Sequence, residues 1–244
     1  MAEEKTAALR ILSTAGIALL AAALGFAGGW AASFTGMNRD ATEKVVRDYI
    51  LDNPEILPEA IERLQARESA SQLGEIRQAV LTPFPGAVLG NPAGKVVLVE
   101  FSDYACGYCR HSVADIDALI ATNPDLKVVL RELPILSPQS ADAARMALAA
   151  AEQGRFEAFH KAIFQIGRPS PEAIEQAAKQ AGLDLERARK VAASKEVEAE
   201  LQRTQAMAAR MGFNGTPSWV IGDQAFSGAV GREALAKAIA AARK

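Results

Sequence analysis

The spacing of hydrophobic residues changes twice along the chain and divides it into three regions. An uncharged run of 24 residues extends from Ile11 to Phe34. From Asn38 onward, hydrophobic residues recur at helical spacing without any strand signal. After the linker-like stretch TPFPGA, Thr82 to Ala87, strand-like runs and amphipathic helices follow one another. The pattern therefore predicts three regions, at residues 1–37, 38–82 and 83–244.

The uncharged N-terminal run predicts either a membrane anchor or a signal sequence. It is long enough to cross a bilayer, which takes about 20 residues, and Lys5 and Arg10 precede it on the side that stays inside. The alternative is a signal that is cleaved near Ala32, where Trp30 makes a mediocre cleavage site. In both cases the chain beyond Met37 is expected outside the cytoplasm, where disulfides can form.

The region 38–82 predicts helices whose hydrophobic stripes are too narrow to be buried within the region itself. Two stripes are present: Leu57, Ile61 and Leu64, then Leu73, Ile76 and Val80. Such a stripe either folds back on the domain that follows or associates with copies of the same chain. The spacing alone is compatible with both arrangements.

The third region has the element order of an α/β fold. A short strand around Val88 and a strong strand over Val96–Phe101 precede an amphipathic helix, and a buried strand over Leu126–Leu133 implies a parallel pair. Residues 137–211 are almost purely helical in pattern. Two strands joined by a two-residue turn at Gly222-Asp223 and a last helix complete the order. We therefore expect a thioredoxin-like fold with a helical insertion.

Composition narrows the class of partner. Half of the residues are hydrophobic (50%), so a packed domain is expected. The net charge is −2, with acidic and basic residues interspersed and no basic stripe. The sequence therefore predicts no binding to nucleic acid.

The chain has two cysteines, Cys106 and Cys109, and both lie where the strong strand ends and a helix begins. A disulfide between residues three apart closes too small a loop to stabilise the fold much. Zinc needs four ligands, but the chain has two cysteines and two histidines, and haem attachment needs a histidine where Arg110 stands. We therefore expect no zinc or haem.

A redox pair fits this position. Unpaired backbone N–H groups and the helix dipole favour a thiolate at Cys106, which would make it the nucleophile. Cys109, one turn further, is expected to be shielded and close enough to attack a mixed disulfide at Cys106, as the resolving thiol. Gly107 and Tyr108 lie between the two cysteines and are expected to tune the thiolate.

The stretches EFSDYACGYC, Glu100 to Cys109, and GTPSWVIG, Gly215 to Gly222, resemble the DsbA-like thiol–disulfide oxidoreductases of the bacterial envelope. The resemblance covers about residues 86–244. It implies a cis bond between Thr216 and Pro217, which would face the cysteines and dock substrate, although a surface turn is the alternative. It also implies that Glu100 is a buried acid with a raised pKa that exchanges a proton with Cys109, unless Glu100 points outward.

Two details resemble the disulfide isomerase branch of that family. One is the Gly-Tyr pair between the cysteines together with Thr216, where the oxidase branch tends to Pro-His and valine. The other is VVRDYILDNPEILPEAIERLQ, from Val45, which resembles the oligomerising segment of the trimeric suppressor-of-copper-sensitivity isomerases. The resemblance implies a homo-oligomer, a trimer or a dimer, formed through residues 38–82.

The sequence thus predicts an envelope enzyme that catalyses disulfide isomerisation, reduction or formation in exported cysteine-containing proteins. A membrane redox partner would recycle the dithiol, and no cofactor is expected because electrons arrive through partner thiols. The protein would be periplasmic, tethered to the inner membrane or released after signal cleavage. The alternatives are a copper-tolerance protein that binds Cu(I) through the two thiols, and an interaction protein that works through residues 38–82.

The two histidines are expected to play lesser roles. His111 follows Cys109 on the same helix and either modulates the thiolate or is simply exposed. His160 shares a helical face with Phe156 and Phe164, which predicts a histidine satisfied within the core.

Overall fold

The computed structural model describes residues 37–243. The predicted anchor or signal sequence lies outside the described residues. Within residues 37–243 no helix combines the length and the hydrophobicity that a membrane span requires. The chain divides into two compact units, Met1–Glu62 and Arg63–Lys244.

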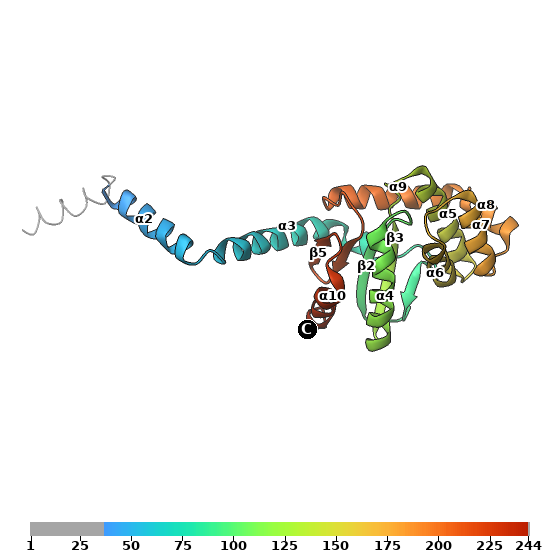
Figure 1. The fold of residues 1–244 in the computed structure, drawn as a ribbon, viewed down its shortest axis with the longest axis horizontal. Coiled ribbons are helices and arrows are strands. Elements are labelled where there is room, and N and C mark those ends of the chain that lie inside the picture. The colour runs from blue at the N-terminus through green and yellow to red at the C-terminus, as the bar shows by residue number, and fades with distance from the viewer. Residues whose placement is uncertain (1–36, 244) are drawn as a thin grey trace, which may run out of the picture. The chain divides into compact units, whose positions relative to one another are not determined.

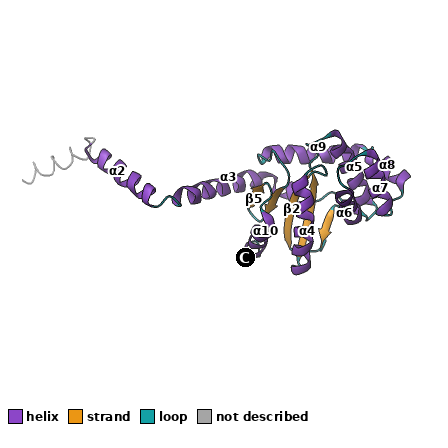
Figure 2. Ribbon diagram, viewed as in Figure 1, coloured by secondary structure: helices purple, strands orange, loops and turns teal. Residues whose placement is uncertain are grey.

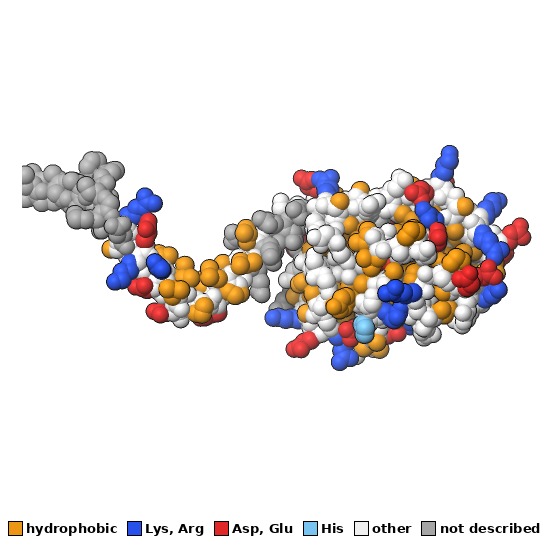
Figure 3. Space-filling model, turned by 45° about the horizontal axis from the view of Figure 1, so that its top comes forward, with side chains coloured by type: hydrophobic (Ala, Val, Ile, Leu, Met, Phe, Trp, Pro, Cys, Tyr) orange, Lys and Arg blue, Asp and Glu red, His pale blue; other side chains and the backbone are white. Residues whose placement is uncertain are grey.

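The first unit is helical where it is described. Helix α2, Met37–Asp52, ends before Pro54, because proline disfavours helical geometry at the residue before it. Helix α3, Ile56–Leu81, begins in this unit and continues into the second. Hydrophobic side chains gather along α2 and the first half of α3 (Figure 3), and seven of them are about half exposed or more: Val45, Val46, Tyr49, Leu51, Leu57, Ile61 and Leu64.

The second unit contains a five-stranded mixed sheet in the order β1-β3-β2-β4-β5 (Figure 2). The strands are β1 Val88–Gly90, β2 Val96–Ser102, β3 Leu126–Glu132, β4 Ser218–Ile221 and β5 Gln224–Ser227. β2 and β3 are parallel, as predicted, and the other pairs are antiparallel. Both strands are buried along nearly their whole length, and hydrophobic residues dominate β2 and the middle of β3, as is typical of strands covered on both faces.

Five helices are inserted between β3 and β4 (Figure 1), and their N-caps explain where four of them start. They are α5 Pro138–Glu152, α6 Phe156–Ile166, α7 Pro171–Gln180, α8 Leu185–Ala192 and α9 Lys195–Arg210. Ser137, Ser170, Asp184 and Ser194 each accept a hydrogen bond from the backbone N–H three residues on. The element order therefore agrees with the one that the sequence predicts.

The two faces of the sheet carry separate cores. One face packs against α4, Gly107–Thr122, against α10, Gly231–Ala241, and against helices of the insertion. The other packs against α9 and the end of α3, where Leu73 and Val80 contribute to the core. The second hydrophobic stripe of region 38–82 thus folds back on the sheet, whereas the first stripe stays exposed. The compact unit accordingly begins before the expected boundary at residue 82, because these α3 side chains belong to its core.

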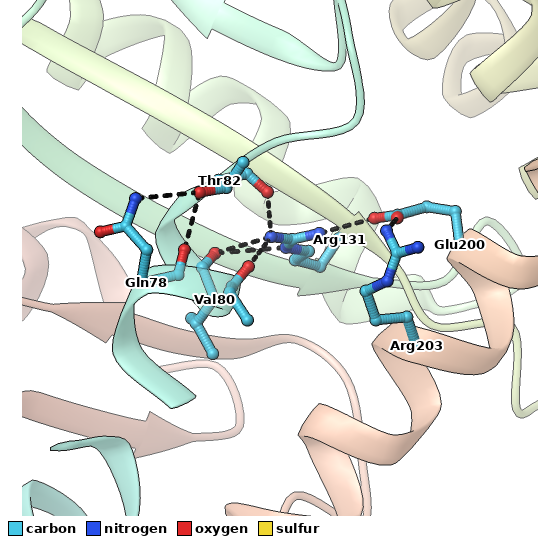
Figure 4. Close-up of polar contacts among 7 residues, drawn as sticks. Gln78, Val80, Thr82, Arg131, Glu200 and Arg203 are labelled. Atoms are coloured by element: carbon cyan, nitrogen blue, oxygen red, sulfur yellow. Dashed lines mark hydrogen bonds and ion pairs between the residues drawn. The ribbon is translucent and has the colours of Figure 1, made fainter. Parts of the chain in front are cut away.

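Arg131 on β3 fastens the end of α3 to the sheet (Figure 4). Its guanidinium is buried and donates to the backbone carbonyls of Ala79, Val80 and Thr82. It also pairs with the buried carboxylate of Glu200 on α9, at 2.6 Å. The carbonyls of Ala79 and Val80 belong to the last turn of α3 and have no partner within the helix, so Arg131 supplies donors that the end of the helix lacks.

Candidate active site

The two cysteines lie at the junction of β2 and α4. The chain turns sharply after β2, and the backbone N–H of Cys106 donates to the carbonyl of Asp103 at 3.0 Å. Cys106 is the N-cap of α4, and its sulfur accepts a hydrogen bond from the backbone N–H of Cys109 at 3.4 Å. Both cysteines are free thiols. This junction places the Cys106 sulfur at the helix N-terminus, where backbone donors stabilise negative charge.

The Thr216-Pro217 bond is cis, as the resemblance implied, and it lies against Cys106. The Cys106 thiol donates to the backbone carbonyl of Thr216 at 3.2 Å. Strand β4 begins directly after this bond, and its Trp219 is paired with Glu100 of β2. The sheet therefore holds the proline loop beside the cysteines, and the alternative of a remote surface turn is excluded.

Glu100 and Cys109 are buried together beneath the surface. Glu100 is only 2% exposed, which excludes the outward orientation, and Cys109 is fully buried. The Ser112 hydroxyl lies 2.8 Å from a Glu100 carboxyl oxygen and 2.7 Å from the Cys109 carbonyl. Burial raises the pKa of Glu100 to about 8, against the opposing hydrogen bond from Ser112. Burial and the nearby Glu100 charge raise the pKa of Cys109 as well. A carboxyl with such a pKa can exchange protons near neutral pH.

The residues between the cysteines face outward. Gly107 is exposed, and the Tyr108 side chain is 68% exposed. A protein that approaches Cys106 therefore meets these two residues. His111, on the next turn, is also exposed, and its Nδ1 lies 2.7 Å from the Gly107 carbonyl.

Asp103 is a site residue that the sequence reasoning missed. One carboxylate oxygen accepts from the Ala105 N–H at 2.7 Å, and the other accepts from the N–H groups of Ile135 and Leu136 at 2.8 and 2.9 Å. It thereby ties the loop after β3 to the turn before Cys106. Its position in a tight turn between a strand and a helix could have indicated this role, because aspartates in turns commonly accept hydrogen bonds from nearby backbone N–H groups.

A second buried polar cluster lies close to the site and was not predicted from the sequence. It consists of Tyr104, Glu132 and His160. The Tyr104 hydroxyl lies 2.9 Å from a Glu132 carboxyl oxygen and 3.2 Å from His160 Nδ1. Burial raises the pKa of Glu132 well above its usual range and lowers the pKa of His160 to about 4. His160 is thus the satisfied core histidine that its helical face predicted.

Residues 37–243 contain no group of three or more histidine, cysteine, aspartate or glutamate side chains placed to bind a metal ion. The site joins a helix-capping thiol, a buried second thiol and a buried acid. These are the parts that disulfide exchange with proton transfer requires.

Solved structures similar to this chain include thioredoxin-like proteins. A thioredoxin-like oxidoreductase from Silicibacter pomeroyi is 39% identical, covering 68% of this chain and 97% of that chain with a TM-score of 0.65. ScsC of Proteus mirabilis, in a transitional conformation, is 27% identical, covering 85% and 98%, with a TM-score of 0.65. A periplasmic thioredoxin-like protein from Salmonella enterica serovar Typhimurium is 26% identical, covering 68% and 95%, with a TM-score of 0.61.

Parts of this chain also match a membrane antiporter and two protein families. The Na⁺/H⁺ antiporter NhaA of Herminiimonas arsenicoxydans is 29% identical over 180 residues, which are 72% of this chain. The chain spans only 29% of that antiporter's length. The copper resistance protein ScsC N-terminal domain matches residues 39–70, and the DSBA-like thioredoxin domain matches residues 97–240. Because the latter match covers more than half of the chain and agrees with the fold and the cysteine site, the chain belongs to the DsbA-like thioredoxin family.

Proposed function

We propose that this protein catalyses thiol–disulfide exchange in other proteins through Cys106 and Cys109. The observation that carries the proposal is the placement of Cys106. Its thiol caps α4, lies 3.2 Å from the Thr216 carbonyl beside a cis-proline, and has the buried Cys109 behind it. An incoming polypeptide could add as an extended strand beside Thr216-Pro217 and present its disulfide to the Cys106 sulfur.

The reaction then proceeds in two exchanges. The Cys106 thiolate attacks a substrate disulfide, forms a mixed disulfide, and expels one substrate thiolate, which takes up a proton. In the second exchange Cys109 passes its proton to the Glu100 carboxylate and attacks the Cys106 sulfur, which releases the second substrate thiol. If a substrate thiol attacks first, the substrate disulfide is rearranged instead. The reverse sequence introduces a disulfide into a reduced substrate.

We propose that the net reaction in substrate proteins is isomerisation or reduction of disulfides. The match of residues 39–70 to the ScsC N-terminal domain supports an oligomer formed through residues 38–82. The exposed hydrophobic residues of α2 and the first half of α3 supply a surface for it. Several sites in one assembly would hold a misfolded substrate while its disulfides rearrange. Substrates would be exported proteins with cysteines, and a membrane redox partner would keep the dithiol reduced.

We propose a periplasmic location. The uncharged run from Ile11 to Phe34 supports it, whether that run serves as an anchor or as a cleaved signal. The likeness to a periplasmic thioredoxin-like protein supports it further.

The test combines the reduction potential with trapping. A potential of the Cys106–Cys109 pair between about −120 and −220 mV is expected, whereas a value below about −300 mV contradicts exchange catalysis by oxidation or isomerisation. Cys109→Ser should accumulate a mixed disulfide with a scrambled substrate protein, and Cys106→Ser should form none. A Cu(I)-binding dithiol protein would instead lose copper equally in both variants and trap no substrate.

A further inference from the structure

Ser102, the last residue of β2, carries a buried hydroxyl without a partner. The residue is 2% exposed, and its Oγ has no hydrogen-bond partner within residues 37–243. Its backbone is part of the sheet, because Ser102 is paired with Glu132 of β3 and its carbonyl accepts from the Leu133 N–H at 2.8 Å. A buried hydroxyl that forms no bond in the resting protein calls for an explanation.

The Ser102 side chain lies on the face of the sheet that carries the cysteine site. Side chains alternate along a strand, so Glu100 and Ser102 share one face of β2. Glu100 meets Ser112 of α4 on that face, and Cys109 is buried on the same helix. Ser112 lies one helical turn beyond Cys109 on α4, so Cys109 is nearer than Ser112 to the end of β2, where Ser102 stands. Burial and the Glu100 charge raise the pKa of Cys109, whereas the Ser102 hydroxyl favours its charged form.

We propose that Ser102 is a catalytic residue of the resolving step, whose hydroxyl donates to the Cys109 sulfur while that sulfur is negatively charged. The inference rests on the proposed thiol–disulfide exchange. A thiol sulfur is a weak acceptor, and a thiolate is a strong one. The hydroxyl therefore gains a bond only as charge develops, and because it has no other partner, no existing hydrogen bond is broken.

With substrate bound to Cys106 as a mixed disulfide, the Cys109 proton moves to the Glu100 carboxylate. The electron pair of the Cys109 sulfur forms the Cys106–Cys109 bond, and the substrate sulfur leaves as a thiolate that takes a proton from solvent. Over both exchanges the protein dithiol is oxidised to a disulfide, and the substrate disulfide is reduced to two thiols. In the reverse direction Cys109 leaves as the thiolate, so Ser102 stabilises the same charge.

A purely structural role for Ser102 predicts a different outcome. Replacing a buried hydroxyl that has no partner removes a desolvated polar group and breaks no hydrogen bond, so Ser102→Ala should leave stability unchanged or raise it. The catalytic role predicts slower resolution in that same variant. In Ser102→Ala the rate of resolution should therefore fall while the stability of the fold stays the same or rises.

The experiment follows the reduced full-length chain after mixing with glutathione disulfide, with acid quenching and mass analysis. Formation of the Cys106–glutathione adduct is second order, and its resolution by Cys109 is first order. In Ser102→Ala we expect resolution to be about tenfold slower, with adduct formation and thermal stability not reduced. Ser102→Thr, which keeps the hydroxyl, should recover most of the rate. Reduction of the disulfide form by glutathione should be slowed in Ser102→Ala as well, which gives a second readout if the threonine variant does not fold.

Thr204 offers the matched control. It is a buried hydroxyl on α9 that likewise has no partner within the described chain, and its neighbours Met207 and Ala208 pack on the opposite face of the sheet. Thr204→Val should resolve the adduct at the wild-type rate. The inference is overturned if Ser102→Ala resolves at the wild-type rate, or if both of its phases slow by the same factor. Absence of any adduct or resolution in the wild-type protein would instead refute the proposed function.

Discussion

The thiol of Cys106 donates to the backbone carbonyl of Thr216 at 3.2 Å, although the two residues are 110 positions apart in the chain. The contact joins the start of α4 to the loop before β4, and all five inserted helices lie between them in sequence. Because the Thr216 acceptor is a backbone atom, the geometry depends on the path of the loop and on the pairing of β4 with β2. The reactive sulfur is therefore positioned by the central sheet.

Replacement of Glu100 by glutamine should separate the two chemical steps. Glu100→Gln keeps an oxygen that can accept from Ser112 but cannot take the Cys109 proton. We expect resolution of the glutathione adduct to slow by about tenfold to a hundredfold, with adduct formation unchanged. In the wild-type protein resolution should accelerate as pH rises toward 8, where the Glu100 carboxylate forms, because its pKa is about 8. A glutamine variant that keeps this acceleration would exclude Glu100 as the proton acceptor.

The same substitution should stabilise the fold. Burial raises the Glu100 pKa from 4.5 to about 8, so between these values the folded state holds a proton that the unfolded state has lost. Stability therefore falls as pH rises through this window, and glutamine removes that loss. At pH 7 the gain in unfolding free energy should reach at most about 3 kcal/mol. Urea unfolding at pH 5 and pH 7 measures this gain. An equal gain at both pH values would contradict the raised pKa of Glu100.

Arg131 and Arg203 bind the same carboxylate from different environments. Arg131 is buried, whereas the Arg203 side chain is 59% exposed, and both contact Glu200. Arg131→Met leaves the Glu200 carboxylate and three backbone carbonyls short of a donor. It should therefore lower the free energy of unfolding by about 3–5 kcal/mol. Arg203→Met, the matched control, should cost less than about 1 kcal/mol. Chemical unfolding of both variants measures the two losses in unfolding free energy. Equal losses would show that the burial of Arg131 is not the cause.

His160 should make the fold sensitive to acid. Burial lowers its pKa from 6.5 to about 4, so between these values the unfolded state binds a proton that the folded state does not. Stability is therefore lost as pH falls from 6.5 toward 4, by up to about 3 kcal/mol at pH 4. His160→Phe should flatten this part of the pH dependence. His111→Gln, at the exposed histidine, is the control, and an equal flattening in both variants would refute the argument.

The exposed stripe of the first unit should control assembly. Leu57 and Ile61 are 49% and 54% exposed in the single chain. If copies associate through these side chains, Leu57→Glu combined with Ile61→Glu should convert the oligomer to a monomer, because association would bury the new charges. Glu55→Gln, also exposed, should leave the mass unchanged. Sedimentation measures the mass, and an oligomer that survives the double substitution would place the interface elsewhere.

The sequence by itself determined the local elements and the reactive pair. Capping serines, β-branched strands and the turn at Gly222-Asp223 act on residues a few positions away, so their effects can be read from spacing. Cys106 and Cys109 were identified for the same reason, because a strand end followed by a helix start is a local pattern. Glu100 and Thr216-Pro217 required the resemblance, since no local rule places them beside the cysteines.

Only the tertiary structure decided which distant residues cover the hydrophobic face of each helix and strand. Hydrophobic spacing shows that a helix has an apolar stripe, but it does not show which partner covers the stripe. The fold was needed to bury Leu73 and Val80 and to leave Leu57 exposed. It was needed equally to bring Tyr104 to His160, 56 positions away, and to leave the Ser102 hydroxyl without a partner on the sheet face that α4 covers. Such contacts depend on how distant elements pack, because hydrogen bonding and burial act through space and not along the chain.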